Sequence, residues 1–193
     1  MTVCMLFALC MLFLVQIPVM AAPGPDGFAN VSWGANRDQV DSAMKAQGFV
    51  YSSQEVRDGI DWVWYKGKVA GISGDISMKL LNGAFYEGQF LLLTQDGQSG
   101  VWFAFRTLYN IIQSKYGAPS SQGGDDDIGK SQWRVWRSLQ PPDSSDNITI
   151  SLLFADFVKQ KSNSGSIIIS NCNLIYSNES LKQHLAVQKR DGL

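Results

Sequence analysis

The stretch FAFRTLYNIIQSKYGAP, from Phe103 to Pro119, predicts an amphipathic helix and decides how the rest of the chain is organised. Its apolar side chains recur at the spacing of one helical face, and its polar side chains fall on the other face. Gly117 provides a left-handed cap and Pro119 prevents continuation, so the helix is predicted to end there. Such a stripe needs a sheet to pack against. The apolar stripe consists of Phe105, Leu108, Tyr109, Ile112 and Tyr116.

Residues 1–21 predict an export signal, which places the mature protein in the periplasm or outside the cell. No charged side chain occurs among them. Val19 and Ala21 are the small residues that a signal peptidase needs, so cleavage is predicted after Ala21. No Lys or Arg precedes the apolar run, and an uncleaved membrane anchor is therefore the alternative. Gln16 and Pro18 favour cleavage.

Length and charge predict one domain without a nucleic-acid or membrane surface. Removal of 21 of the 193 residues leaves 172, a length typical of one compact domain. Residues 22–27 are rich in Pro and Gly and predict a tether, and residues 28–193 predict a single domain. The formal net charge of −1, with both signs mixed, provides no electrostatic footprint for nucleic acid or anionic lipid. We expect neither as a partner.

The mature chain has too few metal-binding and nucleophilic side chains for the common reactive sites. Cys172 is its only cysteine and His184 its only histidine. Zinc sites combine several such ligands, and a Ser-His-Asp or Cys-His arrangement needs its histidine beside a nucleophile. The run around Cys172 predicts a buried strand, and His184 lies in a predicted solvent-facing helix. We therefore expect no cofactor, no metal site, no catalytic nucleophile and no internal disulfide.

The fold class is predicted to be α+β, with a layer of helices on an antiparallel sheet. Asn36 predicts the cap of a first helix that ends at Gly48, and each helix is followed by a group of strands. The predicted order is helix, meander, helix, meander, and residues 36–94 and 103–176 form a hypothetical tandem repeat. Strands are predicted over Tyr51–Val56, Asp61–Tyr65, Val69–Leu80, Ala84–Thr94, Ser131–Ser138, Asn147–Phe157 and Ser166–Tyr176, and a last helix over Glu179–Arg190.

The first meander is predicted to have one buried and one solvated face. Side chains from Val69 to Leu80 alternate strictly between apolar and polar, and the strand after the Asn82-Gly83 turn alternates in the same way. The solvated face is the predicted binding surface. Its candidate residues in this half are Asp75, Lys79, Glu87 and Gln89.

Two tryptophans in the second meander supply further candidates. Trp133 and Trp136 differ by three positions, so in a regular strand they point to opposite faces. One of them is therefore exposed or covered by another element. If Trp136 and Arg134 share the solvated face, they form a hot-spot pair for a partner protein or a stacking platform for a sugar. Arg134 and Trp136 are accordingly predicted binding residues.

Two weaker chemistries stay open. Asp75 and Glu87 could serve as the paired carboxylates of a hydrolase, although ordinary surface acids give the same pattern. The loop Gly123-Gly124-Asp125-Asp126-Asp127 offers carboxylates for a calcium ion, but it lacks the alternation of an EF-hand, and adjacent acids are typical of a solvated loop. Neither pattern leads us to predict a catalytic or metal-binding residue.

The chain contains short motifs at the ends of its predicted helices and strands: Trp33-Gly34, Asn36-Arg37-Asp38-Gln39-Val40, Gly48-Phe49, the run Ile112 to Pro119, Trp133 and Trp136. In these motifs it resembles small bacterial envelope domains of the outer-membrane assembly lipoprotein and β-lactamase-inhibitor-protein-like type. The resemblance implies a helix layer on an antiparallel sheet that is used as a protein-binding surface. The chain has neither the lipid-accepting cysteine of the first group nor the paired cysteines of the second.

The leading functional hypothesis is an exported, non-enzymatic protein-interaction or inhibitor-like module with an envelope protein as its partner. The alternative is a small-ligand protein that binds glycans or peptidoglycan fragments, and a carboxylate-dependent hydrolase is the third reading. An interaction module predicts a broad, shallow face. A ligand-binding protein predicts an enclosed pocket with convergent polar groups.

Overall fold

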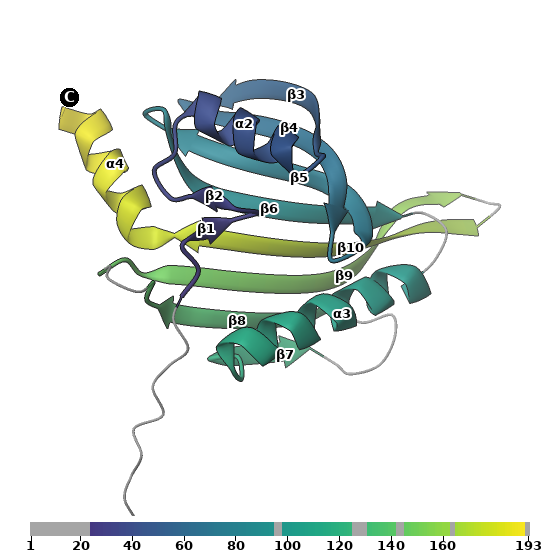
Figure 1. Cartoon of the computed structure of the whole chain (residues 1–193). Helices are drawn as coiled ribbons and strands as arrows, with labels where there is room; N and C mark the ends of the chain where they lie inside the picture. The colour runs from purple at the N-terminus through teal and green to yellow at the C-terminus, as the bar shows by residue number, and fades with distance from the viewer. Residues whose placement is uncertain (1–23, 95–97, 125–130, 142–144, 163–164, 192–193) are drawn as a thin grey trace, which may run out of the picture.

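The chain folds into one large antiparallel sheet with helices on it, as the computed structural model in Figure 1 shows. The structure describes residues 24–94, 98–124, 131–141, 145–162 and 165–191. The predicted signal over residues 1–21 lies outside them. The helices are α2 (Arg37–Ala46), α3 (Gln98–Tyr116) and α4 (Glu179–Asp191).

Eight strands form the main sheet in the order β3-β4-β5-β6-β10-β9-β8-β7, and every neighbouring pair is antiparallel. The antiparallel α+β class is thus confirmed. A separate pair, β1 (Gly27–Phe28) and β2 (Val31–Ser32), precedes α2. The strands of the main sheet are β3 (Val50–Arg57), β4 (Ile60–Val69), β5 (Ile72–Leu81), β6 (Ala84–Thr94), β7 (Ser121–Gly124), β8 (Gln132–Leu139), β9 (Ile148–Ser162) and β10 (Gly165–Asn178).

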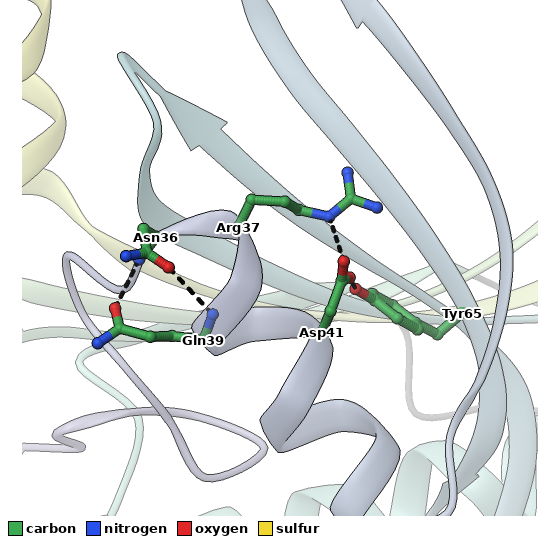
Figure 2. Close-up of polar contacts among 5 residues, drawn as sticks. All are labelled: Asn36, Arg37, Gln39, Asp41 and Tyr65. Carbon is green, nitrogen blue, oxygen red and sulfur yellow. Dashed lines mark hydrogen bonds and ion pairs between the residues drawn. The ribbon is translucent and has the colours of Figure 1, made fainter.

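Helix α2 begins and ends where its capping residues predict. The Asn36 side chain accepts from the backbone N–H of Gln39, and the Gln39 side chain accepts from the Asn36 N–H, which completes a capping box (Figure 2). Val40 and Met44 are fully buried. Gly48 takes a φ of +80° after the last turn, a conformation that a Cβ would disfavour.

Helix α3 carries the predicted apolar stripe but starts five residues before Phe103, at Gln98. Polar residues and a glycine fill its first turn, which therefore reads as loop in the sequence, while Val101 is already fully buried. At the other end, the Gly117 N–H donates to the Gln113 carbonyl at 2.8 Å with a φ of +79°. The predicted C-terminus is confirmed.

Both α2 and α3 lie on the same face of the sheet, and the core lies between them and the strands (Figure 1). We call this the helix-covered face, and the opposite face the open face. Strand residues that point toward the helices are nearly all buried and apolar. They include Val63, Tyr65, Ile76, Met78, Phe90, Trp136, Ile150, Leu152, Phe154, Cys172 and Leu174.

The segment Val69–Leu80, predicted as one strand, begins with the last residue of β4, passes through a turn and continues as β5. Ala70 and Gly71 take φ values of +52° and +80° and connect β4 to β5. Val69 and Ile72 pair and share a face although they are three positions apart, so the turn shifts the alternation by one residue. Ala70 continues the apolar alternation of Ile72 and Ile76, which hides the turn in the sequence. Strand β7 is also absent from the predicted set, because Ser121–Gly124 has no apolar side chain.

The N-terminal segment expected to be a tether is part of the fold from Gly24 onward. The Gly24 N–H donates to the Gln140 carbonyl at 2.5 Å, and Pro25 is buried. The Phe28 ring in β1 lies 5.4 Å from the Tyr176 ring and directly over Gly88 in β6. This packing fixes the β1–β2 pair on the helix-covered face.

Helix α4 packs over one end of the open face. Asn178 caps it by accepting from the Leu181 N–H at 2.8 Å, and Leu185 packs with Leu81 and Tyr86. Lys189 donates to the Asp58 carbonyl at 2.7 Å. In the described part of the chain, none of the helices combines the length and apolarity needed to cross a bilayer.

Two glycine substitutions should change stability in opposite directions. A Cβ at Gly88 would lie 2.2 Å from the Phe28 ring, whereas a Cβ at Gly100 in α3 would meet no atom within 4 Å. We expect Gly88→Ala to lower the free energy of unfolding by about 1–3 kcal/mol through overpacking. Gly100→Ala should raise it by about 0.5–1 kcal/mol, because alanine is the better helix former. Urea denaturation of both variants measures the two values, and equal effects would contradict the packing of β1.

Candidate functional site

The middle of the open face carries a group of aromatic, charged and amide side chains from four adjacent strands. Cross-strand register places them side by side, since paired residues share a face. Trp62 pairs with Lys79, Lys79 with Glu87, and Trp64 with Ser77. We call this group the open-face cluster. Its members are Trp62, Trp64, Ser77, Lys79, Glu87, Gln89 and Asn173.

The aromatic part of the open-face cluster is a pair of stacked indoles on β4. The rings of Trp62 and Trp64 lie 6.1 Å apart with an angle of 21° between their planes. The Lys79 ammonium sits 3.8 Å from the centre of the Trp62 ring, a cation–π distance, and Arg57 lies 5.8 Å from the same ring. Both indoles are half-buried, so part of each remains open to a partner.

Lys79 and Glu87 form an ion pair that is largely withdrawn from solvent. Only 14% of the Lys79 side chain and 11% of the Glu87 side chain are exposed. A pair at this depth gains from mutual attraction but loses much of its hydration. The indole of Trp62 compensates part of that loss, because its ring faces the ammonium. The pair therefore holds both side chains in fixed positions.

A chain of hydrogen bonds crosses three strands beside the ion pair. The Ser77 hydroxyl donates to Gln89 Oε1 at 3.2 Å, and Gln89 Nε2 donates to Asn173 Oδ1 at 2.9 Å. Ser77 is fully buried between its neighbours, whereas Gln89 and Asn173 are half-buried. The amide groups thus present oriented donors and acceptors on the open face.

Of the predicted binding residues, Asp75, Lys79, Glu87 and Gln89 share the open face. Asp75 pairs with Leu91, and Lys79 with Glu87, so four residues along the strand separate Asp75 from Glu87. At the rise of an antiparallel strand that is about 14 Å, longer than the roughly 5–9.5 Å between glycosidase carboxylates. Glu87 is moreover held by Lys79. This geometry does not bring the two acids together for hydrolysis.

The expected exposure of Trp136 and Arg134 is wrong: both point to the helix-covered face. Trp136 is 1% exposed, and its Nε1 donates to the Gly117 carbonyl at 2.9 Å. The register pairs Arg134 with Leu152 and Trp136 with Ile150, which belong to the apolar side of β9. The two residues do share a face, but it is the core face.

Arg134 packs under α3 in place of facing a partner. Its guanidinium lies 5.8 Å from the Phe105 ring and 5.6 Å from the Tyr109 ring, and it donates to the carbonyls of Trp133 and Gly123 at 2.9 and 3.2 Å. These contacts tie helix α3 to the edge of the sheet. Arg134 is therefore a structural residue here.

Trp133 is the tryptophan that the second meander exposes, with 40% of its surface accessible. It pairs with Leu153, whose side chain is on the open face. Its exposure follows from the register between β8 and β9, which places Arg134 and Trp136 opposite the buried Leu152 and Ile150. The sequence shows the apolar side of β9 but not this register.

The remaining candidate chemistries find little support in the described residues. Cys172 is fully buried and His184 is exposed on α4, where its Nε2 lies 3.2 Å from Gln188 Nε2. Among the residues with a described position, no three His, Cys, Asp or Glu side chains gather as a metal site. The three aspartates of the calcium alternative, Asp125–Asp127, lie outside the described residues.

Four cavities among the described residues, with volumes of about 450 to 670 Å³, lie around the β1–β2 pair, at the end of the sheet near Gly48, and between α2 and β3. No residue of the open-face cluster lines any of these four cavities.

Comparisons with known proteins give no indication of the function. No family model matches the chain, and neither a curated protein nor a solved structure matches it. The resemblance to bacterial envelope domains therefore stays a prediction.

Removing one member of the buried ion pair should be costly. We expect Lys79→Met to lower the free energy of unfolding by about 3 kcal/mol, because it leaves the Glu87 carboxylate buried without a partner. Lys79→Met combined with Glu87→Leu should recover most of the loss. Arg57→Met breaks an exposed pair with Glu55 and should cost less than about 1 kcal/mol. Equal costs in urea denaturation for the two single variants would contradict the assignment.

The thiol of Cys172 should be inert in the native protein. Burial raises its pKa to about 12, so almost no thiolate forms at neutral pH, and the side chain is also inaccessible. In the chain without residues 1–21, Cys172 is the only thiol. We expect 5,5′-dithiobis(2-nitrobenzoate) at pH 8 to label it at least about a hundredfold more slowly before than after unfolding in guanidinium. Fast native labelling would place Cys172 outside the core.

Proposed function

We propose that the protein is an exported, non-catalytic interaction module that binds a partner protein of the bacterial envelope through the open-face cluster. The observation that carries this proposal is the arrangement of the stacked Trp62 and Trp64 beside the withdrawn Lys79–Glu87 pair. Protein interfaces draw most of their affinity from such aromatic anchors, surrounded by oriented polar groups.

The breadth of the face supports a protein partner over an enclosed small molecule. The open-face cluster spans β4, β5, β6 and β10, and Trp133 on β8 extends the same face further. Small-molecule sites are concave and bury most of their ligand. A surface that spreads over several strands instead offers the area that two folded proteins need.

Export and internal repetition belong to the same proposal. The apolar residues 1–21 are proposed to direct the chain across the inner membrane. Residues 36–94 and 103–176 are proposed to be tandem repeats: α2 precedes four strands, α3 precedes four more, and the last strands of the two groups, β6 and β10, pair at the centre of the sheet. The proposed binding face is then built by both halves together.

Glycans are the second candidate, and one observation favours them. The adjacent rings of Trp62 and Trp64 present aromatic surface near the Gln89 and Asn173 amides, a combination that can stack on and hydrogen-bond to a sugar. Peptidoglycan fragments are the corresponding ligand class in the envelope.

Site-specific photocrosslinking tests the proposal in cells. We expect p-benzoylphenylalanine in place of Trp64 to form a crosslinked product with one protein, identified by mass spectrometry. The same amino acid in place of Ile111, which is 48% exposed on the outer side of α3, should give no such product. Both positions tolerate a large side chain, and circular dichroism checks that each variant folds.

A second variant separates specific binding from chance proximity. Gln89→Ala removes the central group of the hydrogen-bonded chain and should weaken the crosslink from position 64 about tenfold. Equal products from positions 64 and 111, or none from either, would contradict a protein-binding open face. Saturable binding of muropeptides by the purified chain, lost in Trp64→Ala, would favour the glycan candidate.

A further inference from the structure

A second candidate site lies on the other side of the molecule, between α2 and the edge strand β3. A cavity of about 550 Å³ opens there. Among the described strands β3 pairs with β4 alone, and every residue of β3 is exposed or half-buried. The cavity is lined by Arg37, Asp41, Lys45, Phe49, Val50, Tyr51 and Tyr65.

Arg37 is held in a fixed position at this cavity. Its Nε donates to Asp41 Oδ2 at 2.9 Å, and its guanidinium carbon lies 5.8 Å from the centre of the Tyr51 ring. Figure 2 shows the two terminal nitrogens of Arg37 pointing away from Asp41. These nitrogens form the edge of a guanidinium that can bind both oxygens of a carboxylate.

Asp41 does not offer a competing site for a cation. One of its carboxylate oxygens accepts from Arg37, and the other accepts from the Tyr65 hydroxyl. Burial raises the pKa of Tyr65, and the hydrogen bond to Asp41 raises it further, so the hydroxyl stays protonated and continues to donate. Asp41 therefore orients Arg37 and offsets one of the two positive charges at the cavity.

The second positive charge is Lys45. Arg37, Asp41 and Lys45 are spaced by four residues and share one face of α2. Within the described chain, the Lys45 ammonium makes no hydrogen bond and no ion pair. Two cations and one carboxylate give the lining a net charge of +1, which favours an anion.

The other lining residues of the cavity are aromatic or apolar. Phe49 packs against the core beneath it, and Val50 and Tyr51 remain 66% and 53% exposed. The Tyr51 ring meets the Tyr65 ring edge-on at 6.1 Å. Burying large apolar side chains that are this exposed under a bound group is favourable. The net positive charge nearby requires that group to carry an anionic end.

We propose that this cavity binds a small amphiphilic anion, a carboxylate attached to an aromatic or short aliphatic body. The carboxylate pairs with the outer edge of Arg37 and with Lys45, and the body lies on Phe49, Val50 and Tyr51. The ligand class follows from charge complementarity and from the aromatic and apolar lining. The site shares no residue with the open-face cluster, so either proposal can fail without the other.

Calorimetric titration of the purified chain with 4-phenylbutyrate tests this site, with 4-phenylbutanamide as the neutral counterpart and octanoate as the aliphatic one. We expect saturable binding of at least one of the two acids, and binding of the amide at least about tenfold weaker. Arg37→Gln and Tyr51→Ala should each raise the dissociation constant of the acid about tenfold. Arg106→Gln removes an exposed arginine on α3 and should leave it unchanged.

Two outcomes overturn the proposal. One is the absence of saturable heat for both acids up to about 10 mM, a concentration that would reveal even millimolar affinity. The other is binding that Arg37→Gln leaves as tight as in the unchanged chain. Should Arg37→Gln unfold the protein, Arg37→Lys keeps the charge but loses the two-nitrogen edge, and the proposal requires it to bind more weakly.

Discussion

The pairing of β6 with β10 is the constraint on which the rest of the structure depends. Strand β6 comes from the middle of the chain and β10 from near its C-terminal end, yet they lie together at the centre of the sheet over Glu87–Thr94 and Ser170–Ser177. Their register aligns Phe90 with Leu174 and Leu92 with Cys172. A slip of one residue would place every apolar side chain of one group of strands on the wrong face. The pairing therefore determines that one continuous core serves both helices.

The same register creates the open-face cluster. Gln89 reaches Ser77 within its own meander and Asn173 across the central pairing, so the hydrogen-bonded chain exists only when both groups of strands are joined. Trp62 and Lys79 are assembled within the first meander alone. The aromatic part of the site is thus local, and the amide part depends on the complete sheet.

Features set by neighbouring residues could be predicted from the sequence, whereas features set by distant strand pairs could not. The caps at Asn36, Gly48 and Gly117 are local, and the helix ends they predict agree with the structure. The face of Trp136 depends on which side of β9 lies opposite it, and that side is fixed only by the register. The Ala70-Gly71 turn escaped prediction because Ala70 continues the apolar alternation of Ile72 and Ile76, although the pairing of Val69 with Ile72 shifts the alternation there.

For the candidate sites, the predictable part was the side of the sheet that carries Lys79, Glu87 and Gln89. Alternation alone was sufficient for that. The indole stack over Lys79 could not be predicted, because it requires the pairing of β4 with β5. The cavity at α2 combines residues on a helix and an edge strand, and a pattern of local spacing cannot show that they face each other.

A polar open face follows from water alone, because a sheet covered on one side must be hydrated on the other. Hydration does not account for all of its composition. To be hydrated, a strand needs only charged or small polar side chains that remain exposed. Lys79 and Glu87 are instead mostly withdrawn from water, and Ser77 is completely buried. Withdrawing an ion pair from water destabilises the fold unless close pairing and further hydrogen bonds offset the lost hydration. Trp62 Nε1, which is buried without a hydrogen-bond partner in the described chain, adds a further cost at the same place. The concentration of such costs in one patch, beside an aromatic stack, is the physical argument for a binding role at the centre of the open face.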